Sequence, residues 1–233
     1  MRLDTAFFAP TTLPFPSVRS AILLLLFVVP PNAFAEEGTR VMDSTFVDIK
    51  KVVPTIRIDL RYTQPNNPTR QPLYPRSMPA LLRFGVAQRL TVAQQYLKAR
   101  GYGLKIWDAY RPRAAQEKLW AATRNTDYVA DPRERIGSMH TRGTAVDATL
   151  VDCLGNEVAM PTEFDNFTPA AMLTYQGTNP VVRANLKLLQ KAMARAGFYG
   201  SRTEWWHFCA GDWPLYPPVP KVQLVVQTSV PSL

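Results

Sequence analysis

Four residues in two distant segments have the types and spacing of a catalytic metal site. The chain of 233 residues contains only two histidines, His140 and His207, and an acidic residue lies near each of them, Asp147 and Glu204. Catalytic zinc sites take three protein ligands and leave a fourth position open for water or substrate. We therefore predict that His140, Asp147 and His207 hold one Zn²⁺ per chain, and that Glu204 is the base that acts on its water.

The first segment must turn sharply to bring its two candidate ligands together. His140 and Asp147 are seven residues apart, so on one unbroken strand their side chains would point to opposite faces. Gly143 lies between them, and glycine permits a turn or bulge. We expect Asp147 on a strand over residues 144–150 and His140 on the preceding loop. The alternative is a surface histidine and a strand aspartate that bonds a nearby turn.

The second segment needs a bend for the same reason. Glu204 and His207 are three residues apart, and this spacing puts them on opposite faces of a flat strand. Because Trp205, Trp206 and Phe208 favour a strand, we predict a bulge or bend that turns both polar side chains toward the metal. A buried aromatic strand with a structural histidine is the alternative, but it does not explain the carboxylate.

These segments resemble the signature of a known peptidase family. The motifs Ser138-x-His140-x-x-Gly143-x-Ala145-x-Asp147 and Glu204-x-Trp206-His207 are similar to those of the zinc D-alanyl-D-alanine dipeptidases of the vancomycin-resistance type. That family is related to D,D-carboxypeptidases and resembles the hedgehog signalling domain in fold. The resemblance extends from about residue 59 to 208 and includes Trp107-Asp108-x-Tyr110-Arg111-Pro112 and Gly197-Phe198.

The resemblance implies roles for four further residues. Arg111 would stabilise the oxyanion of the tetrahedral intermediate, Asp165 would face the substrate ammonium, and Tyr62 and Ser138 would line the site. Without the resemblance, the sequence would favour a simpler interpretation of each residue. Arg111 would be an ordinary surface cation, Tyr62 a residue at a strand end and Asp165 a turn or helix-cap carboxylate. Two departures near the expected substrate pocket, residues 66–70 and Pro161, put the dipeptide preference in question but not the hydrolysis.

The hydrophobic pattern predicts the elements that position these residues. Alternation of apolar and polar residues predicts strands at 56–62 and 104–110, and the aromatic residues predict another around Trp205. Helical spacing predicts helices at 79–99, at 113–123 and from Asn179-Pro180 to just before Gly197, and residues 64–79 form a loop rich in Pro and Asn. Without regular βα alternation, this order indicates a single α+β domain, an antiparallel sheet with helices packed on one side.

The N-terminal segment indicates export. Arg2 and Arg19 precede an apolar run at 21–29, and Ala33-Phe34-Ala35 has the small residues of a cleavage site. We predict a signal peptide over residues 1–35 and a catalytic domain over 36–233, with a loose tail from about residue 214. The apolar run is shorter than the about 20 residues that span a bilayer, so we expect a periplasmic or otherwise exported protein without stable membrane insertion after cleavage. An uncleaved anchor is the alternative.

Charge and cysteine content narrow the function further. The net charge of +9 favours anionic surroundings, but the basic residues are scattered and no recognition motif accompanies them, so we do not expect nucleic-acid binding. Cys153 and Cys209 are equally compatible with a disulfide and with free thiols, and neither lies in a CxxC pair that would bind zinc.

We expect hydrolysis of D-alanyl-D-alanine or a close D,D-dipeptide. The alternatives are a D,D-carboxypeptidase acting on peptidoglycan stem peptides and a non-catalytic zinc-binding wall module.

Overall fold

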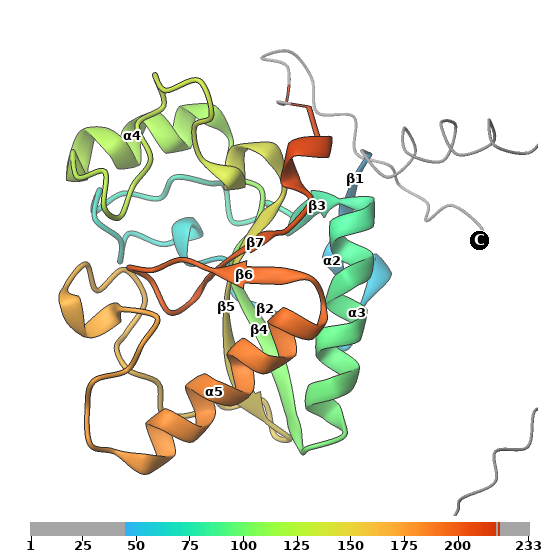
Figure 1. The fold of residues 1–233 in the computed structure, drawn as a ribbon. Helices are drawn as coiled ribbons and strands as arrows, with labels where there is room; N and C mark the ends of the chain where they lie inside the picture. The colour runs from blue at the N-terminus through green and yellow to red at the C-terminus, as the bar shows by residue number, and fades with distance from the viewer. Residues whose placement is uncertain (1–44, 218, 220–233) are drawn as a thin grey trace, which may run out of the picture. The chain divides into compact units, whose positions relative to one another are not determined.

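The computed structural model describes residues 45–217 and 219, which form an α+β domain (Figure 1). The predicted signal peptide and most of the predicted loose tail lie outside the described residues. The strands are β1 (Phe46–Asp48), β2 (Arg57–Ile58), β3 (Leu81–Arg83), β4 (Tyr102–Asp108), β5 (Ala145–Asp152), β6 (Phe198–Gly200) and β7 (His207–Ala210). The helices are α2 (Ile49–Val52), α3 (Phe84–Lys98), α4 (Arg113–Thr123) and α5 (Pro180–Arg195), with short 3₁₀ helices η1 (Arg61–Thr63), η2 (Met139–Arg142), η3 (Pro169–Ala171) and η4 (Trp213–Leu215).

Five strands form the central sheet in the order β2-β4-β5-β7-β6. The pairs β4–β5, β5–β7 and β6–β7 are antiparallel, whereas β2 pairs with β4 in parallel. Parallel neighbours need a long crossover, and the chain supplies one through α3. The predicted α+β domain is thus confirmed, but its main sheet is mixed. A separate antiparallel pair joins β1 to β3.

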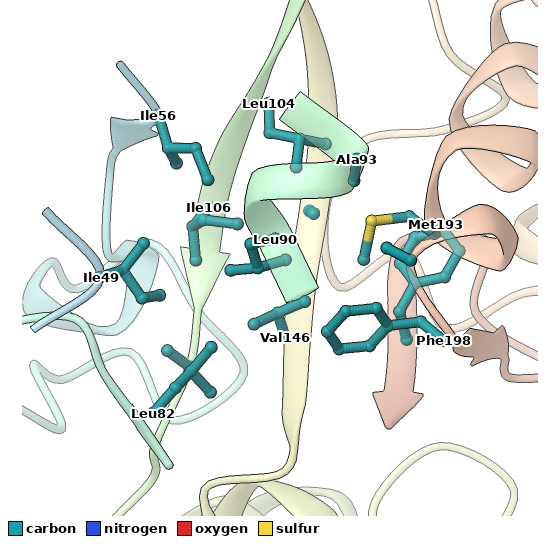
Figure 2. Close-up of a cluster of buried hydrophobic side chains, with 14 of the residues drawn as sticks. Ile49, Ile56, Leu82, Leu90, Ala93, Leu104, Ile106, Val146, Met193 and Phe198 are labelled. Atoms are coloured by element: carbon teal, nitrogen blue, oxygen red, sulfur yellow. The ribbon is translucent and has the colours of Figure 1, made fainter. Parts of the chain in front are cut away.

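The helices α3 and α5 cover one face of this sheet and bury the main core (Figure 1). Leu90 and Ala93 from α3 and Met193 from α5 meet Leu104 and Val146 from the strands, as Figure 2 shows. Along β5 every second side chain, at Val146, Ala148 and Leu150, belongs to this core. Alternation therefore turns Asp147 to the opposite face of the sheet. A smaller buried cluster is formed by η1, the loop before β3, α4 and the loop after α4: Tyr62, Tyr74, Ala115, Leu119 and Val129.

Three predicted elements differ from the structure at their ends. The helix predicted over 79–99 begins at Phe84, because residues 81–83 form β3 and pair with β1. The strand predicted over 56–62 is reduced to Arg57–Ile58, and the chain then turns into η1. The strand predicted around Trp205 begins at His207. In each case the pairing partner, rather than local propensity, sets where the strand lies.

The other predicted elements agree closely with the structure. The helices α4 and α5 have the expected bounds, and Asn179 caps α5 by accepting hydrogen bonds from the backbone N–H groups of Val181 and Val182. Both cysteines are free, Cys153 on the surface and Cys209 buried. No helix in the described part of the chain is long and apolar enough to cross a membrane.

The start of the predicted tail contacts the domain. Tyr216 is buried, and two buried arginines donate hydrogen bonds to carbonyl groups of this segment. Arg142 donates to the carbonyl of Tyr216 at 3.4 Å, and Arg83 donates to the carbonyl of Pro217 at 2.7 Å.

Candidate active site

His140, Asp147 and His207 converge on one point. The Nε2 of His140 lies 3.0 Å from the Nδ1 of His207 and 3.3 Å from the Oδ1 of Asp147. The Nδ1 of His207 lies 2.9 Å from the same carboxylate oxygen. Three ligand atoms bound at about 2.0–2.1 Å to one tetrahedral ion would lie about 3.3 Å apart, so this spacing fits a metal ion with little adjustment. These residues could therefore hold a metal ion.

Two local features bring the three residues together. Asp147 on β5 is directly opposite His207 on β7, so their side chains share one face of the sheet. His140 comes from η2, which ends at Gly143 in the left-handed conformation with φ of 72°. A Cβ at Gly143 would also lie 2.4 Å from the ring of Phe46, so only glycine fits this turn. The predicted role of Gly143 is confirmed.

A backbone carbonyl fixes the tautomer of His140. Its Nδ1 lies 2.7 Å from the carbonyl oxygen of Ala109, and because a carbonyl only accepts, Nδ1 carries the proton. The Nε2 atom therefore presents its lone pair to the point shared with Asp147 and His207. Such a hydrogen bond behind the ligand is usual for metal-binding histidines.

Opposite charges shift the pKa values of the other two residues. Burial disfavours the carboxylate of Asp147, but His140 and His207 outweigh it and hold the pKa of Asp147 well below its usual range. Burial acts to lower the pKa of His207, but Cys209 and Asp147 raise it well above its usual value. The site thus favours an ionised carboxylate between two imidazoles.

A turn before β7 positions Glu204. Trp205 and Trp206 form this turn, and the N–H of His207 donates to the carbonyl of Glu204 at 3.2 Å. The predicted bend is confirmed, and the buried tryptophans anchor it in the core. Burial raises the pKa of Glu204 to about 8, and the nearby carboxylates of Asp147 and Asp165 act in the same direction. A positive ion beside Glu204 would favour its ionised form.

Arg111 is buried and held by a polar network. Its Nε and Nη2 donate to Oδ2 of Asp108 at 3.0 and 2.8 Å, and Nη1 donates to Gln116 at 2.8 Å. The hydroxyl of Tyr74 donates to the other oxygen of Asp108 at 2.9 Å. Burial opposes the charge of Arg111, but the surrounding acidic groups raise its pKa well above the usual value. Arg111 is thus a fixed cation, with Nη2 only 3.7 Å from Asp147.

A β-bulge explains how Asp108 reaches this network. Simple alternation along β4 would place Asp108 on the core face with Leu104 and Ile106. However, Ile106 pairs with Ala148 and Asp108 pairs with Asp147, so β4 has one extra residue at this point. The bulge turns Asp108 to the same face as Asp147.

Tyr62 and Asp165 meet in the same pocket. The hydroxyl of Tyr62 donates to Oδ1 of Asp165 at 3.1 Å, and the guanidinium of Arg111 lies over the Tyr62 ring. The buried Oδ2 of Asp165 has no hydrogen-bond partner among the described residues. Burial and the charge of Asp147 raise the pKa of Asp165 to about 7. An unpaired carboxylate oxygen in this position fits a positively charged ligand group.

All eight residues singled out in the sequence line one pocket of about 200 Å³: Tyr62, Arg111, Ser138, His140, Asp147, Asp165, Glu204 and His207. Ser138 also accepts a hydrogen bond from the backbone N–H of His140 at 3.3 Å and so caps η2. The sequence alone assigns no part in the site to Asp108, Gln116 or Cys209. Asp108 lies in the motif around Arg111 and Cys209 follows His207 by two residues, whereas no local feature distinguishes Gln116.

The chain is similar to a family of known proteins. The family model described as D-ala-D-ala dipeptidase matches residues 42–225. The chain belongs to this family. It is 34% identical over 174 residues to the D-alanyl-D-alanine dipeptidase of Escherichia coli, covering 73% of this chain and 87% of that protein. It is 30% identical over 194 residues to the protein of the same name from Enterococcus faecalis, covering 76% and 96%. The resemblance seen in the sequence is confirmed.

Replacing Asp165 with asparagine is expected to stabilise the metal-free protein at alkaline pH. The raised pKa means that ionising Asp165 costs free energy in the folded state once the pH exceeds the unfolded pKa of 3.8. The shift of about three units corresponds to at most ~4 kcal/mol. Asparagine carries no charge and tolerates the φ of 56° found at this position.

Urea unfolding of both proteins at pH 8 and near pH 4 measures this effect. The gain should be complete above about pH 7 and small near pH 4, where the aspartate is protonated in the folded state and close to half protonated in the unfolded state. An equal difference in unfolding free energy at both pH values would contradict the assigned cause.

Proposed function

We propose that this protein hydrolyses D-alanyl-D-alanine, or a close D,D-dipeptide, to free amino acids. The observation that carries the proposal is the pocket that gathers the candidate metal ligands, the half-buried carboxylate of Glu204, a fixed guanidinium and an unpaired carboxylate oxygen. Family membership and the names of the relatives support the same reaction. A free dipeptide has an ammonium group, a scissile carbonyl and a carboxylate. In the pocket, Asp165 matches the ammonium group, and the metal site with Arg111 matches the scissile carbonyl.

The metal in this proposal is one Zn²⁺ held by Nε2 of His140, Oδ1 of Asp147 and Nδ1 of His207. Two imidazoles and one carboxylate are a donor set that zinc accepts, and three protein ligands leave one position for water or substrate. When bound, zinc polarises the scissile carbonyl and makes water more acidic. The surrounding residues transfer the proton, stabilise the oxyanion and bind the substrate ammonium.

Glu204 is the proposed general base and acid. Its carboxylate takes a proton from the attacking water and passes it to the amine that leaves. The aromatic turn leaves Glu204 only partly exposed, and this burial raises its pKa, which favours the protonated form that the second step needs.

Arg111 is proposed to stabilise the oxyanion. Its three hydrogen bonds to Asp108 and Gln116 leave two of its five N–H donors for the substrate. Because the network holds the guanidinium before substrate arrives, little reorganisation is needed in the transition state.

Changing Arg111 to lysine is expected to lower kcat by about 10²–10³-fold, the usual effect of removing one oxyanion donor. Lysine keeps the charge but cannot donate to Asp108 and Gln116 while it also faces the substrate. Steady-state kinetics on D-alanyl-D-alanine measures the loss. Arg113→Lys is the matched control, since Arg113 lies on the exposed side of α4 and should retain full activity. Equal rates for the Arg111 and Arg113 variants would contradict the role.

Asp165 is proposed to bind the substrate ammonium, with Tyr62 and Ser138 lining the pocket beside it. Pairing with a cation would lower the pKa of Asp165 from about 7 and stabilise its ionised form. Asp165 also borders a second hollow of about 420 Å³, lined by Arg61, Asn66, Asn67 and Pro68 among others. This hollow favours the second candidate function, removal of terminal D-alanine from longer peptidoglycan peptides.

A hydrolysis screen separates these functions. Free dipeptides in D,D, L,D and L,L forms are incubated with the zinc-loaded protein, together with N-acetyl-D-alanyl-D-alanine. We expect cleavage of the free D,D-dipeptide and its loss on acetylation, because the acetylated amine carries no charge for Asp165. Undiminished cleavage of the acetylated peptide would instead establish the carboxypeptidase.

We also propose that the protein is exported after cleavage of residues 1–35. The charged, apolar and small-residue segments at 2–35 support this proposal. Expression of the full chain in a bacterium, followed by fractionation and mass measurement, is expected to give a periplasmic protein that begins at Glu36. A full-length protein in the cytoplasmic fraction would contradict it.

A further inference from the structure

Cys209 lies directly behind one of the candidate metal ligands. It follows His207 by two residues on β7, so the two side chains share one face of the strand. The Sγ of Cys209 is 3.1 Å from Nε2 of His207, and only 5% of the cysteine is exposed. The thiol is therefore buried against the imidazole and not available as a ligand in the pocket.

The position of the ring proton of His207 follows from the groups that face its Nδ1 atom. Its Nδ1 points at Oδ1 of Asp147 and at Nε2 of His140, at 2.9 and 3.0 Å. If Nδ1 is to present a lone pair to a metal, the proton of the neutral ring must reside on Nε2. A buried N–H needs an acceptor, and the sulfur of Cys209 is the group within reach.

The two histidines thus use opposite tautomers with different acceptors. His140 faces the site through Nε2 and donates from Nδ1 to the carbonyl of Ala109. His207 faces the site through Nδ1 and has the sulfur of Cys209 behind Nε2. Tyr199 is directly opposite Cys209 on β6. The β6–β7 pairing therefore fixes the backbone that carries the thiol behind the ring.

We infer that Cys209 is a positioning residue, whose sulfur fixes the tautomer and ring orientation of His207 for metal binding. This inference rests on the proposed function, in which His207 is a ligand. A partner behind a metal-binding histidine usually contributes 10- to 100-fold to metal affinity, commonly through a carboxylate, a carbonyl or water. A thiol in this position is a weak acceptor, but it is buried and its backbone is held by the β6–β7 pairing.

Metal affinity of Cys209 variants tests the inference. Cys209→Ala removes the acceptor, whereas Cys209→Ser retains one. Zinc affinity is measured by competition with a chromophoric chelator, and the absorption spectrum of the cobalt(II)-loaded protein reports the ligand geometry. We expect Cys209→Ala to weaken zinc binding by about 10-fold or more and to alter the spectrum, with Cys209→Ser within a few-fold of the parent.

Two controls separate positioning from packing and from general thiol loss. Cys209→Val fills the space of the thiol without an acceptor, so it should weaken zinc binding as Cys209→Ala does even if alanine loosens the core. Cys153→Ala removes the exposed cysteine and should leave zinc affinity unchanged. Unfolding midpoints of the metal-free variants show that each is folded.

The outcomes distinguish the inference from the function on which it rests. Zinc affinity that is equal in the parent, Cys209→Ala and Cys209→Val would overturn the positioning role, whatever the parent hydrolyses. Weakened affinity in the alanine and valine variants, with recovery by serine, would support it. A parent that binds zinc in this manner but cleaves no dipeptide would overturn the proposed function and leave the positioning role standing.

Discussion

Glu204→Gln is expected to lower kcat for D-alanyl-D-alanine by about 10²–10⁴-fold, the range of a general acid–base group. Glutamine has nearly the same shape, so the turn at Trp205 and Trp206 should persist, but it cannot accept the proton of the attacking water or return it to the leaving amine. Steady-state and single-turnover kinetics with the zinc-loaded variant measure the loss in the chemical step.

The zinc content of this variant decides between an enzyme and a binding module. Glu204 is not among the three proposed ligands, so the variant should bind zinc with the stoichiometry of the parent, as metal analysis after dialysis would show. A loss of hydrolysis with zinc retained would reject the non-catalytic module. If hydrolysis continued at the parental rate, Glu204 would not be the base.

His140→Ala and His207→Ala are each expected to abolish stoichiometric zinc binding and hydrolysis. Each change leaves two of three protein ligands, and catalytic zinc sites depend on all three to hold the ion. Metal analysis and the dipeptide assay measure both effects. The fold should persist because both side chains lie in the pocket and outside the main core.

The double variant with both histidines replaced is the strictest test of the metal site. One zinc ion per chain in that protein would show that the metal lies elsewhere. Ser201→Ala provides a matched control, because Ser201 lines the same pocket without offering a nitrogen or carboxylate ligand, and its zinc content should be unchanged.

The family and the candidate site residues could be predicted from the sequence because both depend on residue type and order. With two histidines in the chain, the choice of nitrogen ligands was already narrow. The helices α4 and α5 were also predictable, since capping residues and helical periodicity act within a few neighbouring residues.

Strand ends were less predictable because distant partners determine them. Residues 81–83 have a helix-compatible pattern, but β1 is available to pair with them. The parallel pairing of β2 with β4 depends on the path of α3 and not on the two residues of β2 themselves.

The sequence by itself determined which chemical groups this protein has and the order in which the chain presents them. Only the tertiary structure decided their mutual placement: the β4 bulge that turns Asp108 toward Arg111, the unpaired oxygen of Asp165, and the thiol of Cys209 behind His207. The bulge and the unpaired oxygen arise where segments far apart in the chain pair or pack, which local residue patterns do not encode. Cys209 is a near neighbour of His207, but the ring orientation that brings Nε2 to the thiol depends on the distant residues His140 and Asp147. The ligand types were therefore visible in the sequence, whereas the groups that hold them in position were not.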